Sequence, residues 1–591
     1  MSNYVLGISC YYHDASATLL KDGKIVAATE EERFTRKKHD ISFPINAISY
    51  CLRSQYITIK DISYIGFYEK PFLKFERILY QHLEKFPFSL KTFLSSMPSW
   101  ISEKTRVLKT IRKKLKYEGD VFFIEHHLAH AASSFLVSPF QNAAILSIDG
   151  VGEWTTTAYG FGEGNSIYLM KEIRFPHSLG LLYSTITAYL GFRVNDSEYK
   201  VMGLSAYGDM NRDTNPYYKK LRNIIDIKED GSYRLDMDYF IYHYKNRMPS
   251  DRLCRLLEGD IRKPESEITE RHRDIAAALQ LVYEEALFKI LRHLCKVTNS
   301  KNVVLGGGCG LNSVSNGKIL KNTGFEKIWI QPNASDGGTS LGVASYIYHS
   351  ILGHERCFLL EDAYLGPSYF SEEIKHFLEE SNINYYEFSD KDELLTKTAE
   401  LIYKNNVVGW FQGGMEWGPR ALGNRSILAN HCNPEAKELL NTKVKHRERF
   451  RPFAPVVCIE DALLYFECDI PVPQPTDFML MVYLVKKEWY KKIPSVVNID
   501  RSGRLQTIRE EQNPLYYGLI KQFGRLSGVP ILINTSFNIR GEPIVCSPYD
   551  AYKCMMGTGI DYLVIDKYLI KREDNTQDIW DSEIYAKEAE E

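Results

Sequence analysis

A pattern of short apolar runs opens the chain and occurs again further along. Residues 5–9, 15–20 and 25–29 form three such runs, with a Lys-Asp-Gly-Lys turn between the second and the third. Runs of this length joined by an Asp-Gly turn predict three β-strands that include a hairpin. The same plan returns in residues 143–148, 155–161 and 166–173. The repetition predicts a duplicated α/β domain, with two unrelated hairpins as the weaker alternative.

Two further segments have the spacing of helices. Residues 72–118 combine helical periodicity with many Lys and Arg and few acidic residues. This predicts a solvated helical insertion; a lid over an anionic ligand and a membrane-surface helix are the alternatives. Residues 271–297 carry apolar side chains at helical spacing and predict a core helix.

The second half of the chain predicts another α/β domain. Residues 392–404 have helical spacing, while 407–411 and 529–533 are strand-like apolar runs. A polar residue before proline is typical of an N-cap with proline at the first helical position, and such pairs occur at Asn433-Pro434, Asn513-Pro514 and Ser547-Pro548. We expect a first domain over residues 1–355, a second over 356–571, and a polar acidic tail, poorly ordered, over 572–591.

Composition narrows the class of protein. A chain of 591 residues is too long for one core. A formal charge of -2 argues against a nucleic-acid binder or a disordered chain. The 11 cysteines contain no Cys-x-x-Cys pair, so neither a zinc ribbon nor a disulfide framework is indicated. With no apolar run of membrane-spanning length and no leader pattern at the N-terminus, we expect a cytoplasmic location.

Four residues are candidate metal ligands. If residues 126–135 are helical, His126 and His130 lie one turn apart on one face and can reach one ion. Asp149 follows a predicted strand, and Asp336 stands in an Asp-Gly-Gly turn. Buried histidines without a metal, and a turn without a function, are the alternatives.

Two regions are candidate phosphate sites. A strand at 302–305 runs into the glycine-rich turn 306–312, where backbone N–H groups could approach a nucleotide, although such turns also serve packing. The second domain concentrates cations among glycines and prolines, which places them on loops around a cleft suited to phosphates, with a solvated basic face as the alternative. These cations are Arg420, Arg425, Lys443, Lys445, Arg447, Arg449 and Arg451.

Several blocks of the chain carry a resemblance. The chain resembles the O-carbamoyltransferases of the NodU/CmcH family, in order from about residue 4 to 570. The blocks are YHDAS at 12–16, HHLAHAA at 126–132, SIDGVGE at 147–153, GLSAYG at 203–208, DGG at 336–338, MEWGPRALGNRS at 415–426, RFRPFAP at 449–455, NTSFN at 534–538 and GEP at 541–543.

The resemblance implies a fold and a two-step reaction. The N-terminal domain would have the duplicated ATPase fold of actin and sugar kinases, similar to the tRNA threonylcarbamoyladenosine ligase, and the C-terminal domain would be YrdC-like. The C-terminal domain would convert carbamoyl phosphate and ATP, the latter with Mg²⁺, into carbamoyl adenylate. In the N-terminal domain a hydroxyl of a natural product or sugar would then take the carbamoyl group and release AMP.

The resemblance also assigns residues. His126, His130, Asp149 and Asp336 match the metal positions, with Fe²⁺ the usual ion, and His13 matches the general base. The nucleotide positions of the N-terminal domain are Lys200, Gly203, Gly307, Gly308 and Asn312. The carbamoyl phosphate and ATP positions of the C-terminal domain are Arg420, Lys443, Arg449, Arg451, Arg501, Arg504, Asn534 and Ser536.

The chain departs from the family pattern at three places, and other functions were weighed. Gly414 stands where an Arg is expected, Asn430 where an Asp is usual, and Cys309-Gly310 replaces a more apolar pair. The alternatives are a threonylcarbamoyl-tRNA-type enzyme and a non-catalytic nucleotide-binding partner protein; a metalloprotease is excluded because His127 occupies the place of the catalytic Glu. We expect a small-molecule acceptor, no nucleic acid and no membrane partner, with a homodimer left open and the acceptor undetermined.

Overall fold

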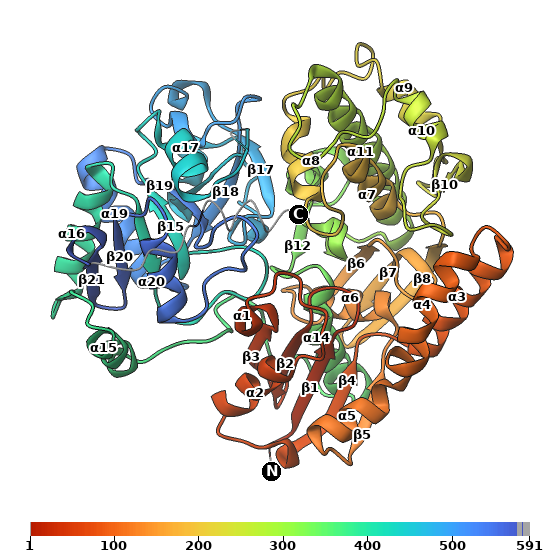
Figure 1. The fold of residues 1–591 in the computed structure, drawn as a ribbon, viewed down its shortest axis with the longest axis horizontal. Coiled ribbons are helices and arrows are strands. Elements are labelled where there is room, and N and C mark those ends of the chain that lie inside the picture. The colour runs from red at the N-terminus through yellow and green to blue at the C-terminus, as the bar shows by residue number, and fades with distance from the viewer. Residues whose placement is uncertain (1, 449, 576–581, 583–591) are drawn as a thin grey trace. The chain divides into compact units, whose positions relative to one another are not determined.

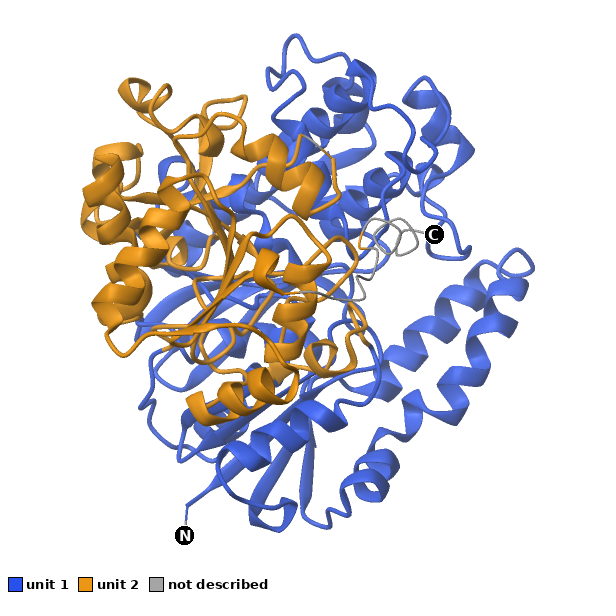
Figure 2. Cartoon of the chain, turned by 60° about the vertical axis from the view of Figure 1, so that its left-hand side comes forward, with its two compact units in different colours: residues 1–28, 41–359 blue, residues 29–40, 360–591 orange. Residues whose placement is uncertain are grey.

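The chain divides into two compact units. The computed structural model describes residues 2–448, 450–575 and 582. Unit 1 comprises Met1–Ala28 and Ile41–Leu359, and unit 2 comprises Thr29–Asp40 and Leu360–Glu591 (Figure 2). The division therefore falls after Leu359 rather than after residue 355, and the short segment Thr29–Asp40 belongs to the C-terminal unit, which the sequence pattern did not indicate.

Unit 1 contains two five-stranded sheets with the same plan (Figure 1). The first has the order β3-β2-β1-β4-β5, with β1 antiparallel to β2 and parallel to β4. The second has the order β8-β7-β6-β11-β12, with β6 antiparallel to β7 and parallel to β11. The strands are β1 Tyr4–Ser9, β2 Ser16–Lys21, β3 Lys24–Glu30, β4 Ile62–Phe67, β5 Asp120–Phe123, β6 Asn142–Ile148, β7 Thr155–Glu163, β8 Ser166–Arg174, β11 Asn302–Gly306 and β12 Lys327–Ile330. The predicted duplication of an actin-like α/β unit is confirmed by this matching strand order.

Two helices of unit 1 pack closely together and position the candidate metal centre described below. Helix α6, His126–Phe135, begins and ends as the spacing of its histidines predicts. Helix α14, Thr339–Ser345, approaches it so closely that a Cβ on Gly342 would lie 1.9 Å from the carbonyl oxygen of Ala129. Only glycine permits this approach. The helix that carries the histidines and the turn that precedes α14 are therefore fixed together.

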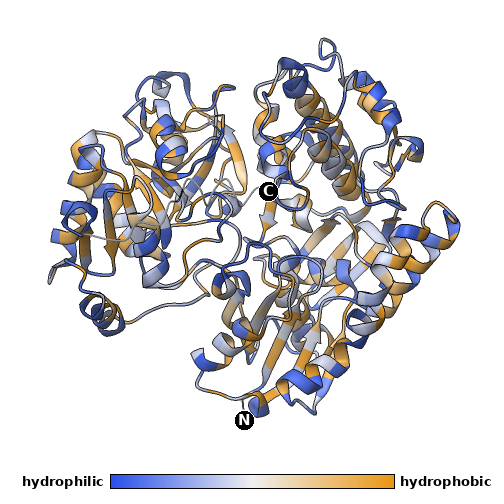
Figure 3. Cartoon of the chain, viewed as in Figure 1, coloured by the Kyte–Doolittle hydropathy of each residue, from blue (hydrophilic) through white to orange (hydrophobic). Residues whose placement is uncertain are grey.

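The basic insertion is helical, as predicted, and its first two helices form a hairpin (Figure 2). Helices α3 Pro71–Glu84 and α4 Leu90–Ser102 are followed by α5 Val107–Leu115. The hairpin has a small core of its own, in which Ile78, Met97 and Trp100 are buried. Figure 3 shows hydrophobic and hydrophilic positions interleaved along α3 and α4. The other helices of unit 1 used below are α7 Leu179–Tyr189, α8 Glu198–Ser205, α11 Glu270–Thr298 and α12 Ser313–Asn316.

Unit 2 is built on one nine-stranded sheet. Its core lies between the sheet and helices α16, Lys391–Tyr403, and α19, Pro514–Ser527, and includes Trp410 and Phe523. The strand order is β13-β21-β20-β14-β15-β19-β16-β18-β17. Their bounds are β13 Tyr386–Glu387, β14 Val408–Phe411, β15 Arg425–Ala429, β16 Ala454–Cys458, β17 Met481–Leu484, β18 Ser502–Ile508, β19 Ile531–Ser536, β20 Tyr562–Ile565 and β21 Tyr568–Lys571.

Two of the three predicted caps of unit 2 are confirmed and one is wrong. The side chain of Asn513 accepts from the backbone N–H of Tyr516 at the start of α19, and Ser547 caps α20, Pro548–Met556, in the same way. Helix α17 instead begins at Ala436, because the side chain of Asn433 accepts from the N–H of Glu435 and closes a turn before it. A local side-chain bond has replaced the helical one.

The remaining global expectations concern cysteines, membranes and the tail. All 11 cysteines are free. Within the described residues, no helix combines the length and the apolar character needed to cross a membrane. The predicted tail begins with a short turn of 3-10 helix at Arg572–Asp574, and most of it lies outside the described residues.

Candidate metal centre and phosphate-binding loops

The four predicted metal ligands converge in unit 1. His126 Nε2 lies 3.0 Å from Asp149 Oδ2 and 3.6 Å from Asp336 Oδ1. His130 Nε2 lies 3.8 Å from the same oxygen of Asp149 and 3.6 Å from that of Asp336, and 3.1 Å from His126 Nε2. The histidines come from the first two turns of α6, Asp149 follows β6, and Asp336 begins the turn before α14. The sequence spacing has therefore produced one cluster.

These distances fit a single ion. A metal about 2.1 Å from each ligand keeps neighbouring ligand atoms about 3.0–3.4 Å apart, depending on its coordination geometry. All four donor atoms lie within 4.8 Å of one another, and the side chains are buried. Two imidazole nitrogens facing each other at 3.1 Å can share at most one hydrogen, whereas both can direct lone pairs at one cation. The second oxygen of Asp336 is also buried without a partner in the described chain. Imidazole and carboxylate ligands suit iron, manganese or zinc.

A glycine-rich turn lies directly against this centre. The other carboxylate oxygen of Asp149, Oδ1, accepts a hydrogen bond of 3.1 Å from the backbone N–H of Gly308. Gly307 has a φ of +87°, and a Cβ there would lie 2.1 Å from the carbonyl oxygen of Ile148, so glycine is required. The turn after β11 and the metal ligand after β6 are thus held at the shared end of two neighbouring parallel strands.

Neighbouring side chains fix the orientation of α6. The carboxylate of Glu153 accepts from the backbone N–H of His126 at 3.2 Å and from that of Lys70 at 2.8 Å. Tyr68 packs edge-on against the His126 ring with centroids 5.5 Å apart. His127 turns away and places its Nδ1 2.8 Å from Ser147 Oγ, and burial holds the pKa of His127 well below its usual range. His127 is therefore a structural neighbour, not a ligand.

His13, the proposed base, is held at both ring nitrogens. Nδ1 lies 2.8 Å from Asp14 Oδ2, and Nε2 lies 2.5 Å from the carbonyl oxygen of Asn195. Burial would lower the pKa of His13, but the carboxylate of Asp14 and the other acceptors outweigh it and raise the pKa to about 10. The imidazole is thus a cation that donates on both sides. It can act as a base only after it has lost one of its two ring protons.

The predicted nucleotide-binding residues of unit 1 lie on different elements. Lys200 and Gly203 lie on α8, and the Lys200 ammonium is 5.5 Å from the centre of the Phe192 ring. Asn312 caps α12, and its amide exchanges two hydrogen bonds of 3.1 Å with Gln280. Gln280 also bonds the hydroxyl of Tyr183. Asn312 therefore anchors the turn to α11, and this network was not found from the sequence because Gln280 looked like one position of a core helix.

In unit 2, the block at 415–426 forms a tight loop around one carboxylate. Glu416 is buried, and its Oε1 accepts from the N–H groups of Leu422 at 2.8 Å, Asn424 at 2.8 Å and Arg425 at 3.0 Å. The guanidinium of Arg425 donates to backbone carbonyls and lies 3.6 Å from the Phe411 ring centre. Arg425 is thus structural, while the half-buried Arg420 lies on the loop that Glu416 shapes.

Lys445, rather than the predicted Lys443, reaches the strand end of β19. Lys443 is exposed. Lys445 is buried, and its Nζ donates to the carbonyl oxygen of Ser536 and to two oxygens of Asn538 at 2.9 Å. Burial, with Arg447 and Arg451 nearby, holds the pKa of Lys445 well below its usual range. Lys443 lies in the helical turn Leu440–Val444 and Lys445 directly follows it, so their spacing in the sequence could not distinguish their environments.

The other predicted residues of unit 2 differ in environment. Asn534 is buried and donates to Gln506 Oε1 at 2.6 Å, so it stabilises the sheet. Arg504 lies half-buried on β18, whereas Arg501 is exposed in the turn before it. Arg451 lies 3.8 Å from Glu448. Arg449 lies outside the described residues.

Comparison with known proteins decides the family. The carbamoyltransferase N-terminal domain matches residues 4–345, and the carbamoyltransferase C-terminal domain matches residues 399–572. The chain belongs to the carbamoyltransferase family. An uncharacterized protein of Synechocystis, sll1178, is 43% identical over 96% of this chain and 97% of its own. The nodulation protein NolNO of Sinorhizobium fredii is 34% identical over 96% of this chain and 80% of its own.

Among solved structures, component A of (R)-2-hydroxyglutaryl-CoA dehydratase from Acidaminococcus fermentans is similar with a TM-score of 0.31 and 14% identity, covering 59% of this chain and 99% of its own. The family assignment confirms the predicted resemblance and the enzyme class. The fold of unit 1 is established by its own strand order, described above.

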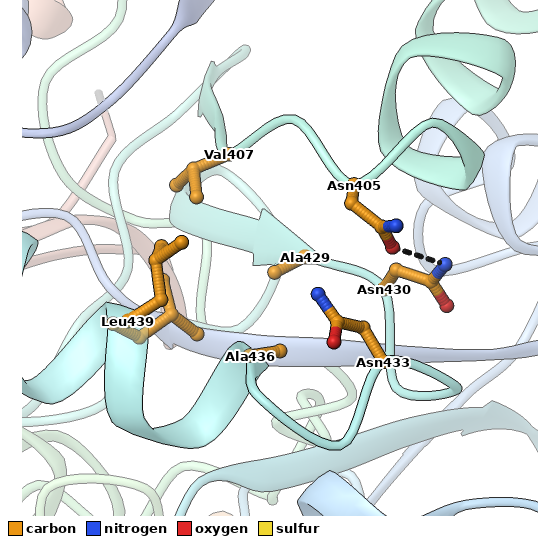
Figure 4. A pocket seen from close by; sticks show the side chains of 8 residues that line it. Asn405, Val407, Ala429, Asn430, Asn433, Ala436 and Leu439 are labelled. Atoms are coloured by element: carbon orange, nitrogen blue, oxygen red, sulfur yellow. Dashed lines mark hydrogen bonds between the residues drawn. The ribbon is translucent and has the colours of Figure 1, made fainter.

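One departure from the family pattern has a structural explanation. Figure 4 shows Asn430 in a small pocket at the end of β15, pointing toward Asn405. Asn430 Nδ2 donates to Asn405 Oδ1 at 2.9 Å, while its own oxygen accepts from the N–H of Cys432 at 2.9 Å. An amide can donate and accept at once, which a carboxylate cannot. The pocket has a volume of about 10 Å³, room for one water molecule, so it is not a substrate site.

Proposed function

We propose that this family member is an ATP-dependent O-carbamoyltransferase with two reaction sites. Unit 2, which we infer to be YrdC-like, would form carbamoyl adenylate. Unit 1, which we infer to be similar to the tRNA threonylcarbamoyladenosine ligase, would transfer the carbamoyl group to a hydroxyl of a natural product or sugar. The observation that supports this most directly is the cluster of His126, His130, Asp149 and Asp336, whose Asp149 also contacts the glycine-rich turn.

The first half-reaction would occur among the cations of unit 2. Water releases phosphate from carbamoyl phosphate and leaves carbamate, whose oxygen attacks the α-phosphorus of ATP and expels pyrophosphate. Guanidinium groups bind phosphate oxygens bidentately and neutralise the charge that develops on them. Arg420, on the loop held by Glu416, is the contact we assign to this step, with Arg451 and Arg504 as further candidates.

The second half-reaction would occur in unit 1. The acceptor oxygen attacks the carbonyl carbon of carbamoyl adenylate, the bond to the adenylate oxygen breaks, and AMP leaves. An ion held by His126, His130, Asp149 and Asp336, which we propose to be Fe²⁺, would supply a positive charge for phosphate or carbonyl oxygens. His13 would first lose its Nε2 proton to solvent and would then take the acceptor's proton at that nitrogen, once the acceptor hydroxyl has replaced the carbonyl oxygen of Asn195 there.

One assay tests this function. The purified protein, supplied with Mg²⁺ and ATP, should release pyrophosphate only when carbamoyl phosphate is present. Bicarbonate and threonine should not substitute, because a threonylcarbamoyl-tRNA-type enzyme would use them. Release with bicarbonate and threonine alone, or no release under any condition, would contradict the proposal. Mass spectrometry of hydroxylated metabolites incubated with the complete mixture then identifies the acceptor.

A further inference from the structure

One buried arginine of unit 1 differs from all the others. Arg33, Arg77, Arg262 and Arg425 are the arginines buried in the described part of the chain. Arg33, Arg262 and Arg425 donate to carboxylate or carbonyl oxygens, at 2.7 Å to Gly418, 2.6 Å to Leu190 and 2.9 Å to Pro367. Arg77 is 5% exposed, and its Nε has no partner among the described residues. The guanidinium carbon lies 4.8 Å from the centre of Phe175. Burial lowers the pKa of Arg77, and the carboxylates of Glu69 and Glu153 oppose this through space, without a hydrogen bond to it among the described residues.

A neighbour on the same helix shows what a satisfied cation looks like. Lys74 lies three residues earlier on the same face of α3 and is 3% exposed. Its Nζ is 2.5 Å from Glu69 Oε2 and 4.4 Å from the centre of the Tyr12 ring. Burying a charge without a hydrogen-bonding partner costs several kcal/mol, so a fold does not gain stability from a side chain placed as Arg77 is. The position of Arg77 therefore calls for a ligand.

Arg77 lies near groups that adjoin the candidate metal centre. Glu153 accepts from the backbone N–H of Lys70, where α3 begins, and from that of His126, where α6 begins. Tyr12, beneath Lys74, directly precedes His13 in the chain. Burial raises the pKa of Tyr12, the carboxylates of Asp336 and Asp149 raise it further, and Arg77 opposes them. Tyr12 thus lies within the influence of both the metal carboxylates and the arginine.

We propose that Arg77 binds an anionic group, a carboxylate, sulfate or phosphate, of the molecule that receives the carbamoyl group. Its planar guanidinium can grip two oxygens of such a group, while Phe175 packs against its face. One turn further along the same face, Gln81 Oε1 is also buried without a partner among the described residues and can accept from a hydroxyl of the same ligand. Burial lowers the pKa of Arg77 to about 10, so the side chain remains a cation at neutral pH.

This proposal names the acceptor class for the transfer site and rests on the proposed function. It favours acceptors that carry an anionic group over acceptors that carry only cationic groups. Other sources of the same anion are the phosphate of the nucleotide and free phosphate, and the experiment below separates them.

The first test compares Arg77→Met with Lys74→Met in thermal unfolding of the metal-loaded protein. In buffer without multivalent anions, Arg77→Met should unfold at the same temperature as the unsubstituted protein or higher, because it removes a buried charge that has no hydrogen bond to a described residue. Lys74→Met should unfold lower, because it strands Glu69. If Arg77→Met instead unfolds several degrees lower, as Lys74→Met does, Arg77 has a structural partner and the proposal is wrong.

The second test adds sodium sulfate as the probe, at constant ionic strength. The unsubstituted protein and the control Arg112→Gln, an exposed position on α5, should gain about 1–3 °C more than Arg77→Met, whose remaining gain reports the general effect of sulfate and its binding to other cations. An equal gain in all three would overturn the proposal. AMP affinity should be unchanged in Arg77→Met; a tenfold loss would assign Arg77 to the nucleotide instead. Pyrophosphate release by Arg77→Met should also be normal, and if the unsubstituted protein releases none, the proposed function fails while the sulfate result still reports on Arg77.

Discussion

The candidate metal centre of unit 1 and the cations of unit 2 are both clusters of charged residues, but they are built differently. Two of the proposed metal ligands lie one turn apart on a helix, and the other two follow a strand and open a turn held against that helix. In unit 2, Lys443 and Lys445 lie two residues apart in the chain, yet Lys443 is exposed and Lys445 is buried against β19. Arg425, the first residue of β15, is bonded to backbone carbonyl oxygens such as that of Pro367. Helical spacing predicts which side chains share a face, but it does not predict which distant partners a cation meets.

The largest expected effect is the loss of the metal. His130→Ala removes one of four ligands from a buried site, so the purified variant should hold less than a tenth of the metal found in the unsubstituted protein. Elemental analysis after gel filtration measures this. The matched control is His127→Gln. His127 is a histidine of the same helix whose ring lies against Ser147, so this variant should keep its metal. Equal metal in His130→Ala and the unsubstituted protein would remove these residues from the site.

The pH dependence of transfer should be steep because His13 is held as a cation. With its pKa raised to about 10, the neutral fraction of His13 grows about tenfold per pH unit below that value. Product formation should therefore rise between pH 7 and 9, while pyrophosphate release, assigned to unit 2, should not follow it. A transfer rate that is flat over this range would show that His13 is not the base.

The same shift has a consequence for stability, with a defined sign. The folded pKa lies above the usual value of 6.5, so the stabilisation from protonated His13 is complete below pH 6.5, declines above it, and is lost as the pH rises through about 10. The difference in melting temperature between His13→Asn and the unsubstituted protein should shrink over that range. A constant difference would mean that the ring is held neutral.

Arginine substitutions in unit 2 sharpen the comparison of loop cations. Loss of one charge-assisted bidentate contact to phosphate costs about 2–3 kcal/mol, so Arg420→Ala should release pyrophosphate roughly a hundredfold more slowly. The control is Arg525→Ala, an exposed arginine of α19, which should behave as the unsubstituted protein. A normal rate for Arg420→Ala would identify the loop as a solvated basic surface.

The smallest effect concerns the two lysines. Lys445→Met leaves the carbonyl oxygens of Ser536 and Asn538 without the ammonium that binds them, which should lower the free energy of unfolding by about 2–3 kcal/mol. Lys443→Ala, at an exposed position in the same turn, should leave it unchanged. Urea unfolding of both variants measures the difference. A larger loss of unfolding free energy in Lys443→Ala than in Lys445→Met would show that Lys443 makes the more important contact.

The extent of prediction from sequence follows from these particulars. The strand repeats, α6, α11 and the caps Asn513 and Ser547 were predicted because each depends on neighbours within a few residues. The segment Thr29–Asp40 was not assigned to unit 2, because its bonds, such as Arg36 to the carbonyl oxygens of Pro543 and Ile544, join positions some 500 residues apart.

The same distinction between local patterns and distant contacts applies to the candidate site. The candidate metal ligands can be predicted from helical spacing and strand ends. The lack of a hydrogen-bond partner for Arg77 Nε cannot be predicted in this way, because it depends on which distant residues surround the side chain. Lys445 was among the cations found in the sequence, but its contact with Ser536 was not predicted, and the bonds of Gln280 to Asn312 were missed, because these partners come from distant elements. Neither lysine spacing nor the apolar period of α11 carries that information.

The central claim is that the two half-reactions occupy two sites, and a matched pair of variants tests it directly. His130→Ala alters unit 1 and Arg420→Ala alters unit 2, and each is assayed with carbamoyl phosphate, ATP and an acceptor for both pyrophosphate and carbamoylated product. The account predicts that His130→Ala releases pyrophosphate at the normal rate but forms no product, whereas Arg420→Ala loses both. Loss of pyrophosphate release in a folded His130→Ala, or product formation by it, would contradict the account.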